Sequence, residues 1–315
     1  MLHKPYKSLD EQIVILQSRG MIVHDSAAHV LRRESYYSIV NGYKDLFLDT
    51  NFRNADEERY LPGTTFDDLF ALFSFDRQLR CLLFEAITQT EASLKAACAH
   101  EFTKLHPDEV NPYLFPDNYD QGRRSSAMTL INKVFTKILE LDGNPRNKGE
   151  YGGKAYIRHC MEDLDGQVPF WVLTNDLSLG QTVWFFQTQT KEVRLAIAKS
   201  FTKLYSDTHS KPHIITVKHL DRIFNRLVFF RNLCAHDERC YCAHYDHRLN
   251  ESVFQVINDL HYLLDKSSYI EFLKRISALL DNIMSTIPQQ SKSICKAMGI
   301  QNRNQLTQQL AKSLT

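Results

Sequence analysis

The sequence predicts an all-α protein built as a helical bundle. Apolar residues recur at three- and four-residue steps through several long stretches, which is the spacing of one face of an α-helix. Two of these stretches begin with residues that cap helix N-termini, at Ser8 and at Thr65. Glycine and proline are sparse, with 11 and 9 residues in a chain of 315, so few positions interrupt a helix. These observations together favour helices throughout the chain.

The N-terminal part of the chain predicts two helices. Ser8 and Glu11 have the spacing of a capping box, which begins the first helix, and Gly20 ends it. A second helix is expected from about residue 25 to residue 40, where the pair Asn41 and Gly42 stops it.

A very long helix is expected from Thr65 to about Leu105. Its apolar face is formed by Phe66, Phe70, Phe73, Leu79, Leu83, Ala86, Ile87, Leu94 and Ala97. Arg77 and Arg80 occupy other positions on the same helix, and we expect them to face solvent or RNA.

The rest of the chain predicts shorter helices separated by polar or proline-containing connections. Proline interrupts the chain between residues 107 and 120, and residues 142–153 read as a flexible surface loop. Pro169 suits the first turn of a short helix. Further helices are expected at about 125–141, 191–205, 218–235, 251–264 and 268–287. We divide the chain into an N-terminal helical segment (1–60), a main helical domain (61–287) and a basic C-terminal tail (288–315).

The composition restricts the class of protein. A hydrophobic content of 43% and a charged content of 24% are typical of a soluble globular protein with an ample core. A net charge of +1 excludes a surface coated in basic residues, so any nucleic acid must bind in a local groove. No apolar run reaches the length of a membrane span, and the first residues lack the apolar core of a signal peptide. Seven cysteines without framework spacing favour a reducing cytoplasm, and no motif calls for a cofactor.

The most informative stretch is residues 218–249. Thr216 is expected to cap a helix whose apolar stripe consists of Leu220, Ile223, Phe224, Leu227 and Phe230. Arg231 falls on the same stripe, and a buried arginine needs an acidic partner or an anion. His236 follows five residues later, and histidine exchanges protons near neutral pH. A fixed cation beside a proton carrier suits the cleavage of a phosphodiester.

Two other arginines stand five residues before a histidine, in the pairs Arg19/His24 and Arg239/His244. The first pair spans Gly20, and the second lies in a polar run, so only Arg231/His236 ends a strongly apolar helix. The alternative reading is structural. Arg231 would then anchor a buried ion pair, and His236 would interact with the helix C-terminus, which favours a cation.

The stretch RNLCAHDERCY resembles the signature of the Abi-like proteins of the AbiD/AbiF type, within the HEPN superfamily of helical ribonucleases. NGYKDLF (41–47), FDRQLR (75–80) and PFWVLTNDLSLGQTVWFF (169–186) also resemble the family. The resemblance runs from about residue 4 to residue 261. It implies a core of long antiparallel helices, and it assigns the catalytic positions to Arg231, Asn232 and His236.

The resemblance implies a metal-independent endoribonuclease that acts as a bacterial toxin in abortive infection. Histidine would assist attack by the 2′-hydroxyl on its own phosphate, and arginine would stabilise the growing charge. The products would carry 2′,3′-cyclic phosphate and 5′-hydroxyl ends. Since one histidine cannot easily be both base and acid, we expect a homodimer with a composite site. Glu91, either a solvated carboxylate or the partner that neutralises Arg231, and Arg239 are possible supporting residues.

Two other functions remain open. The protein could bind RNA without cutting it and be restrained by a structured noncoding RNA that acts as antitoxin. It could also be a zinc-stabilised module, because Cys234, His236, Cys240, Cys242, His244 and His247 crowd fourteen residues. Their spacing is not that of a usual zinc knuckle, and we assign no metal site.

The C-terminal tail contains basic residues and no acidic residue after Asn282. Lys292, Lys296 and Arg303 could form a helical arm on RNA phosphates. A loosely packed polar tail is the competing interpretation.

Overall fold

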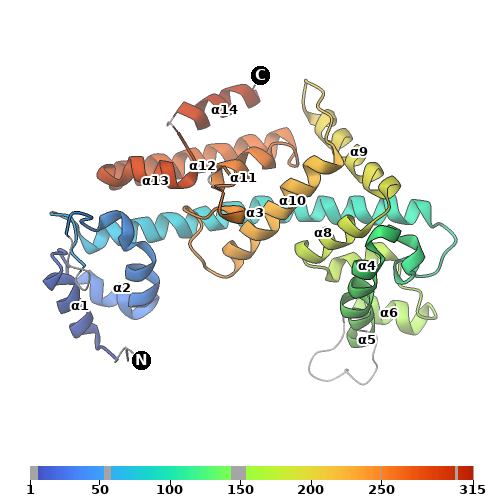
Figure 1. Ribbon diagram of the computed structural model, residues 1–315, viewed down its shortest axis with the longest axis horizontal. Coiled ribbons are helices and arrows are strands. Elements are labelled where there is room, and N and C mark those ends of the chain that lie inside the picture. Colours follow the sequence, from blue (N-terminus) through green and yellow to red (C-terminus); the bar gives the residue numbers. More distant parts are fainter. Residues whose placement is uncertain (1–5, 53–57, 143–153, 249, 302–303, 315) are drawn as a thin grey trace. The chain divides into compact units, whose positions relative to one another are not determined.

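The protein is all-α, as the sequence predicts. The computed structural model describes residues 6–52, 58–142, 154–248, 250–301 and 304–314, and these residues contain no β-strand. No helix among them is long and apolar enough to cross a membrane. The α-helices are α1 (Leu9–Ser18), α2 (Ser26–Glu34), α3 (Phe66–Leu105), α4 (Arg124–Leu130), α5 (Thr136–Asp142), α6 (Ala155–Asp163), α7 (Phe170–Leu173), α8 (Leu179–Thr188), α9 (Lys191–Thr208), α10 (Val217–Ala235), α11 (Val253–Leu260), α12 (Lys266–Thr286), α13 (Ser291–Met298) and α14 (Asn304–Leu314) (Figure 1).

Short helical turns connect several of these helices. π-Helical turns are formed by Tyr37–Asn41 and Ile131–Phe135. Single 3-10 turns are formed by Lys44–Phe47, Pro112–Leu114, Pro116–Asn118, Gln121–Arg123, Thr174–Asp176, Tyr245–His247 and Pro288–Gln290. The surface loop expected at residues 142–153 lies outside the described residues from residue 143 onward.

The capping box predicted at Ser8 and the cap predicted at Thr65 are both confirmed. The Ser8 hydroxyl accepts from the Glu11 backbone N–H at 3.2 Å, and the Glu11 carboxylate accepts from the Ser8 N–H at 2.7 Å. The Thr65 hydroxyl accepts from the Asp68 N–H at 3.1 Å, and the Asp68 carboxylate accepts from the Thr65 N–H at 2.8 Å. Each box satisfies two backbone donors that the first turn of a helix leaves open, so both helices begin where the sequence predicts.

α2 is shorter than expected. It ends at Glu34, because Ser35 adopts a positive φ of 63° that no α-helix contains. A π-helical turn then continues the chain to Asn41. α3, by contrast, has its full expected length of 40 residues, about 60 Å at the rise of an α-helix.

Two compact units make up the chain. The first contains residues 1–84, 233–255 and 270–315, and the second contains residues 85–232 and 256–269. α3, α10, α11 and α12 each contribute residues to both units. The domain boundaries predicted at 60/61 and 287/288 stay a prediction.

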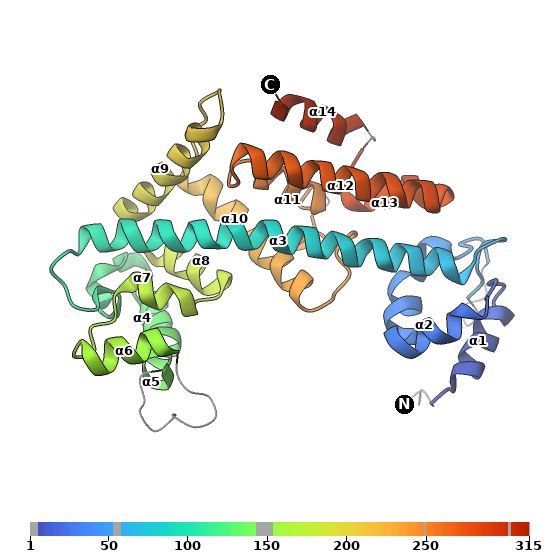
Figure 2. The same ribbon diagram turned by 180° about the vertical axis from the view of Figure 1, so that it is seen from behind.

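An aromatic core holds the second unit together. The rings of Phe170 and Phe185 lie 4.4 Å apart, and Phe102 packs edge-on against Phe185 at 5.2 Å. The Tyr119 hydroxyl in this core donates to the carbonyl of Tyr113 at 2.6 Å, so burial leaves it satisfied. α4 packs against α8 in the same unit (Figure 2).

The second unit also gathers histidines and tyrosines where α9, α10 and α11 end or begin. The His209 ring stacks on Tyr205 at 3.9 Å, and His261 Nε2 lies 3.2 Å from the Tyr205 hydroxyl. His213 lies edge-on to His219, at 6.1 Å between ring centroids. Burial, helped by the nearby histidines, lowers the pKa of His261 to about 4, and burial also lowers the pKa of His219. Both rings are therefore packed in their neutral form at neutral pH.

This histidine cluster predicts a loss of stability in mild acid. An unfolded histidine has a pKa near 6.5, above the folded value of His261, so the unfolded chain binds protons first as pH falls. The contribution of His261 is complete above pH 6.5 and is lost between about pH 6.5 and pH 4. Thermal unfolding measured from pH 7.5 to pH 4 should show His261→Phe losing less stability over this window than the wild type. Parallel curves for the two proteins would contradict the prediction.

Two glycines in the first unit predict different costs of substitution. Gly63 and Gly299 have positive φ values of 83° and 81°, a conformation that costs an L-residue about 1–2 kcal/mol. A Cβ on Gly63 meets no atom within 4 Å, whereas one on Gly299 falls 2.0 Å from the Ser252 hydroxyl. Urea unfolding should therefore show Gly299→Ala losing about 1–3 kcal/mol more than Gly63→Ala. Equal losses would mean that the contact with Ser252 relaxes freely.

Candidate functional site

α10 carries the predicted apolar stripe. The Thr216 hydroxyl accepts from the His219 N–H at 3.2 Å and caps the helix start. The stripe residues Leu220, Ile223, Phe224, Leu227 and Phe230 are all completely buried. Burial of these large side chains fixes the rotation of the helix about its axis, so the positions of the residues in its last turn are determined as well.

The three predicted catalytic residues lie at the end of α10. Arg231 is half-buried in the last turn, and Asn232 beside it is exposed. His236 is the first residue after the helix, and its side chain is exposed. Arg231 and Asn232 belong to the second compact unit and His236 to the first, because the division falls between residues 232 and 233.

The chain leaves α10 through a left-handed turn. Asp237 has a positive φ of 57°, and the Glu238 N–H donates to the Leu233 carbonyl at 3.1 Å. This is the pattern of a Schellman motif, in which glycine usually occupies the left-handed position. Aspartate tolerates this conformation better than most residues, but less well than glycine, so contacts from outside the turn can stabilise it.

Arg80 of α3 supplies such contacts. Its Nη2 donates to the Asp237 carboxylate, and its Nη1 donates to the Glu238 carbonyl at 3.2 Å. The guanidinium therefore contacts both residues that follow His236.

Asp76, one helical turn before Arg80, holds the next part of the same segment. Its carboxylate accepts from the backbone N–H groups of Cys240, at 3.0 Å, and Tyr241, at 2.7 Å. It also accepts from the Tyr43 hydroxyl at 2.7 Å and from Arg80 Nη1 at 2.9 Å. The 236–241 segment is thus anchored to α3 by two side chains.

This anchor is deeply buried. Asp76 is 0% exposed and Arg80 3% exposed. Burial raises the pKa of the Asp76 carboxyl, while the hydrogen bonds from Cys240 and Tyr43 and the charge of Arg80 oppose that shift. Burial and the Asp76 charge raise the pKa of the Tyr43 phenol, which keeps its hydroxyl a donor. The pKa of the Cys240 thiol is raised chiefly by a hydrogen bond with the Cys234 thiol and also by burial.

The expectation that Arg80 faces solvent or RNA is wrong, because its guanidinium is enclosed by Asp76 and Asp237. Arg77 is more exposed, but it forms a two-pronged pair with Glu34 at 2.8 and 2.6 Å. It also lies over the Phe73 ring at 4.5 Å. Asp76 is not among the site residues that the sequence predicts, although an aspartate four residues before an arginine in an apolar helix is typical of an ion pair.

The two possible supporting residues have partners. Glu91 is not a solvated carboxylate, since its side chain is 12% exposed and lies 2.9 Å from Lys95. Its pairing with Arg231 stays a prediction. Arg239 donates to the Gly42 carbonyl at 2.8 Å and to Asp45 at 3.2 Å, which adds a further tie to the 236–241 segment.

The C-terminal basic residues lie on a packed helix. Lys292 and Lys296 are exposed on one face of α13, while Ile294 and Met298 of the same helix are buried. Leu306 of α14 is also buried, so the described tail is not loosely packed. Arg303 lies outside the described residues.

The zinc alternative gains no support. Among the described residues, no group of three or more histidine, cysteine or acidic side chains could hold a metal ion. Cys240 is completely buried. The side chain of His247 is not described.

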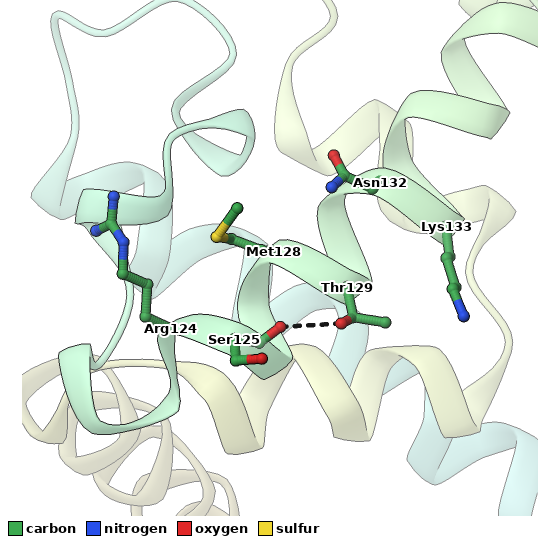
Figure 3. A pocket seen from close by; sticks show the side chains of 6 residues that line it. All are labelled: Arg124, Ser125, Met128, Thr129, Asn132 and Lys133. Carbon is green, nitrogen blue, oxygen red and sulfur yellow. Dashed lines mark hydrogen bonds between the residues drawn. The ribbon is translucent and has the colours of Figure 1, made fainter.

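An open pocket of about 500 Å³ lies along α4 and the π-helical turn after it, and Figure 3 shows its lining. Arg124 and Lys133 stand at its two ends, but Arg124 is paired with Asp117 and Gln121. None of the predicted site residues lines this pocket.

Comparison with protein-family models gives a match. The model of the Abi-like protein family matches residues 29–242, about two thirds of the chain. No curated protein and no solved structure matches this chain. The matched residues include the Asp76–Arg80 pair and the end of α10 with Arg231, Asn232 and His236. The chain therefore belongs to the Abi-like protein family, a membership that indicates a role in phage defence by abortive infection.

Proposed function

We propose that the protein is a metal-independent endoribonuclease of the HEPN type, with Arg231, Asn232 and His236 as its catalytic residues. The observation that carries the proposal is the placement of His236. It is an exposed histidine directly after α10, in a segment that α3 anchors through buried hydrogen bonds. Exposure lets the imidazole meet a substrate, and an anchored backbone limits the conformations it must lose on binding.

The residue types match the demands of the reaction. Histidine is the side chain that most often transfers protons in catalysis, since its unperturbed pKa lies near neutrality. Arginine remains charged at any physiological pH and suits the oxygens of a phosphate. Arg231 is half-buried, so its charge is less screened by water than that of an exposed arginine. Asn232 is exposed and can donate to a phosphate or sugar oxygen.

The proposed reaction is an internal transesterification. The 2′-oxygen of a ribose forms a bond to the adjacent phosphorus as its proton passes to an imidazole. The bond from phosphorus to the 5′-oxygen of the next nucleotide breaks, and that oxygen receives a proton. Arg231 stabilises the charge that collects on the phosphoryl oxygens during the exchange. The products carry a 2′,3′-cyclic phosphate and a 5′-hydroxyl group.

The reaction moves two protons, one from the 2′-hydroxyl and one to the leaving 5′-oxygen. A single imidazole that begins neutral can accept the first but cannot at the same moment supply the second. Two copies of the chain related by a two-fold axis bring two histidines to one cleft. We therefore propose a homodimer in which His236 of each copy serves the same phosphate. Cleavage of cellular RNA by this dimer would arrest an infected cell and stop phage multiplication.

Removal of the imidazole should abolish cleavage. His236→Ala should cut RNA about 10²–10⁴ times more slowly than the wild type, because it lacks the proton carrier. Arg231→Ala should cut RNA about 10²–10³ times more slowly than the wild type, because it lacks the charge that stabilises the phosphoryl oxygens. The assay is purified protein with a labelled RNA in chelator, followed by analysis of the new ends.

Matched controls are present in the chain. His159→Ala removes an exposed histidine of α6, and Arg222→Ala removes an exposed arginine of α10; both should retain wild-type cleavage. An RNA with a single 2′-deoxy position should resist cleavage there. Full activity in purified His236→Ala would refute the assignment, and RNA binding without cleavage by the wild type would select a non-catalytic function.

The proposed dimer predicts the molecular mass in solution. Light scattering should give twice the chain mass of 36.7 kDa at the concentrations where cleavage is seen. A fully active species with the mass of one chain would contradict the composite site while leaving the role of His236 open to the cleavage assay.

A further inference from the structure

One pair of α3 side chains makes four contacts with the segment that begins at His236. Arg80 bonds to the Asp237 carboxylate and the Glu238 carbonyl, while Asp76 accepts from the N–H groups of Cys240 and Tyr241. On the other side, His236 continues directly from α10. The residue is therefore held from both directions along the chain, although its own side chain is exposed.

We propose that Asp76 and Arg80 are positioning residues for His236, fixing the left-handed turn after α10 so that the imidazole is presented in one orientation. This inference rests on the proposed function. Neither residue can touch RNA in this structure, because Asp76 is 0% and Arg80 3% exposed. Their effect on the reaction passes through the backbone of the 236–241 segment.

The geometry of Asp237 shows why the pair is needed. Its φ of 57° lies in a region that non-glycine residues visit infrequently, although aspartate tolerates it better than most. The bond from Arg80 holds its side chain in this conformation, and the Glu238 contact fixes the next peptide. Without these bonds the turn can relax to a negative φ, which would rotate the chain at His236.

Tyr43 supports the pair from a second direction. Its hydroxyl donates to Asp76, and its ring lies edge-on to Phe73 at 5.5 Å and stacks with Tyr241 at 6.1 Å. Tyr43→Phe removes one donor and keeps the ring contacts. It should therefore have a smaller effect than a change in Asp76 itself.

A matched buried pair in the second unit makes the test specific. Asp259 is 2% exposed and bonds to Arg226, which is as buried as Arg80. Asp76→Asn and Asp259→Asn thus each neutralise one buried, arginine-paired carboxylate. RNA cleavage is measured per folded molecule, at a temperature where circular dichroism shows both variants folded.

Asp76→Asn should lower kcat by about a hundredfold, the cost expected when a catalytic group is displaced by about 1 Å. KM should stay within about twofold, because the substrate contacts are unchanged. Asp259→Asn should keep the wild-type kcat. Wild-type kcat in Asp76→Asn, or an equal loss in Asp259→Asn, would overturn the proposal.

Three changes at Asp237 separate positioning from proton transfer. Asp237→Asn keeps the tolerance for positive φ and an oxygen that accepts from Arg80, so it should retain most of kcat and an unchanged pH profile. Asp237→Ala loses both features, so its kcat should fall toward that of Asp76→Asn. Asp237→Gly keeps only the backbone freedom, so its kcat should lie between those of Asp237→Asn and Asp237→Ala. A complete loss in Asp237→Asn would overturn the proposal by making the carboxylate itself part of the chemistry.

Hydrogen exchange distinguishes failure of this inference from failure of the proposed function. The amides of Cys240 and Tyr241 should exchange faster in Asp76→Asn than in Asp259→Asn, whether or not RNA is cut. A wild type that cleaves no better than His236→Ala would defeat the proposed function, and with it the catalytic role of the pair. Unchanged exchange of both amides in Asp76→Asn would defeat the anchoring itself.

Discussion

The hydrogen bonds of one buried carboxylate determine the conformation of the chain after α10. Asp76 has no contact with water, and a carboxylate in that position is stable only when its oxygens are fully bonded. Tyr43, Arg80 and two backbone N–H groups provide those bonds. Removing one partner of such a buried pair costs about 3–5 kcal/mol, because the other charge is left uncompensated. The segment that begins at His236 is therefore held by α3 residues more than 150 positions earlier in the chain, and not by its local turn alone.

The region that the family model matches contains the whole candidate site. The match covers residues 29–242, and it contains Tyr43, Asp76, Arg80 and the end of α10. The exposed lysines of α13 lie beyond it. The buried pair and the exposed histidine thus lie within the matched region, whereas the C-terminal helices lie outside it.

Features set by local sequence were predictable. The two capping boxes and the apolar stripe of α10 depend on residues a few positions apart, and the structure confirms them. Arg80 was misjudged because its partners, Asp237 and Glu238, lie more than 150 residues away. The break in α2 was missed because serine rarely adopts the positive φ of Ser35, and no turn residue marks it. Helical periodicity gives the face on which a residue stands, but it does not show what covers that face.

The first compact unit is assembled from three stretches of chain, and its last stretch begins at residue 270. A ribosome releases these stretches in order, so the complete second unit, which ends at residue 269, emerges before the first can close. A nascent or truncated chain that stops before residue 270 lacks α13, α14 and most of α12. These missing residues all belong to the first unit. The segment that carries His236 is thus synthesised before α13 and α14, which belong to the same compact unit.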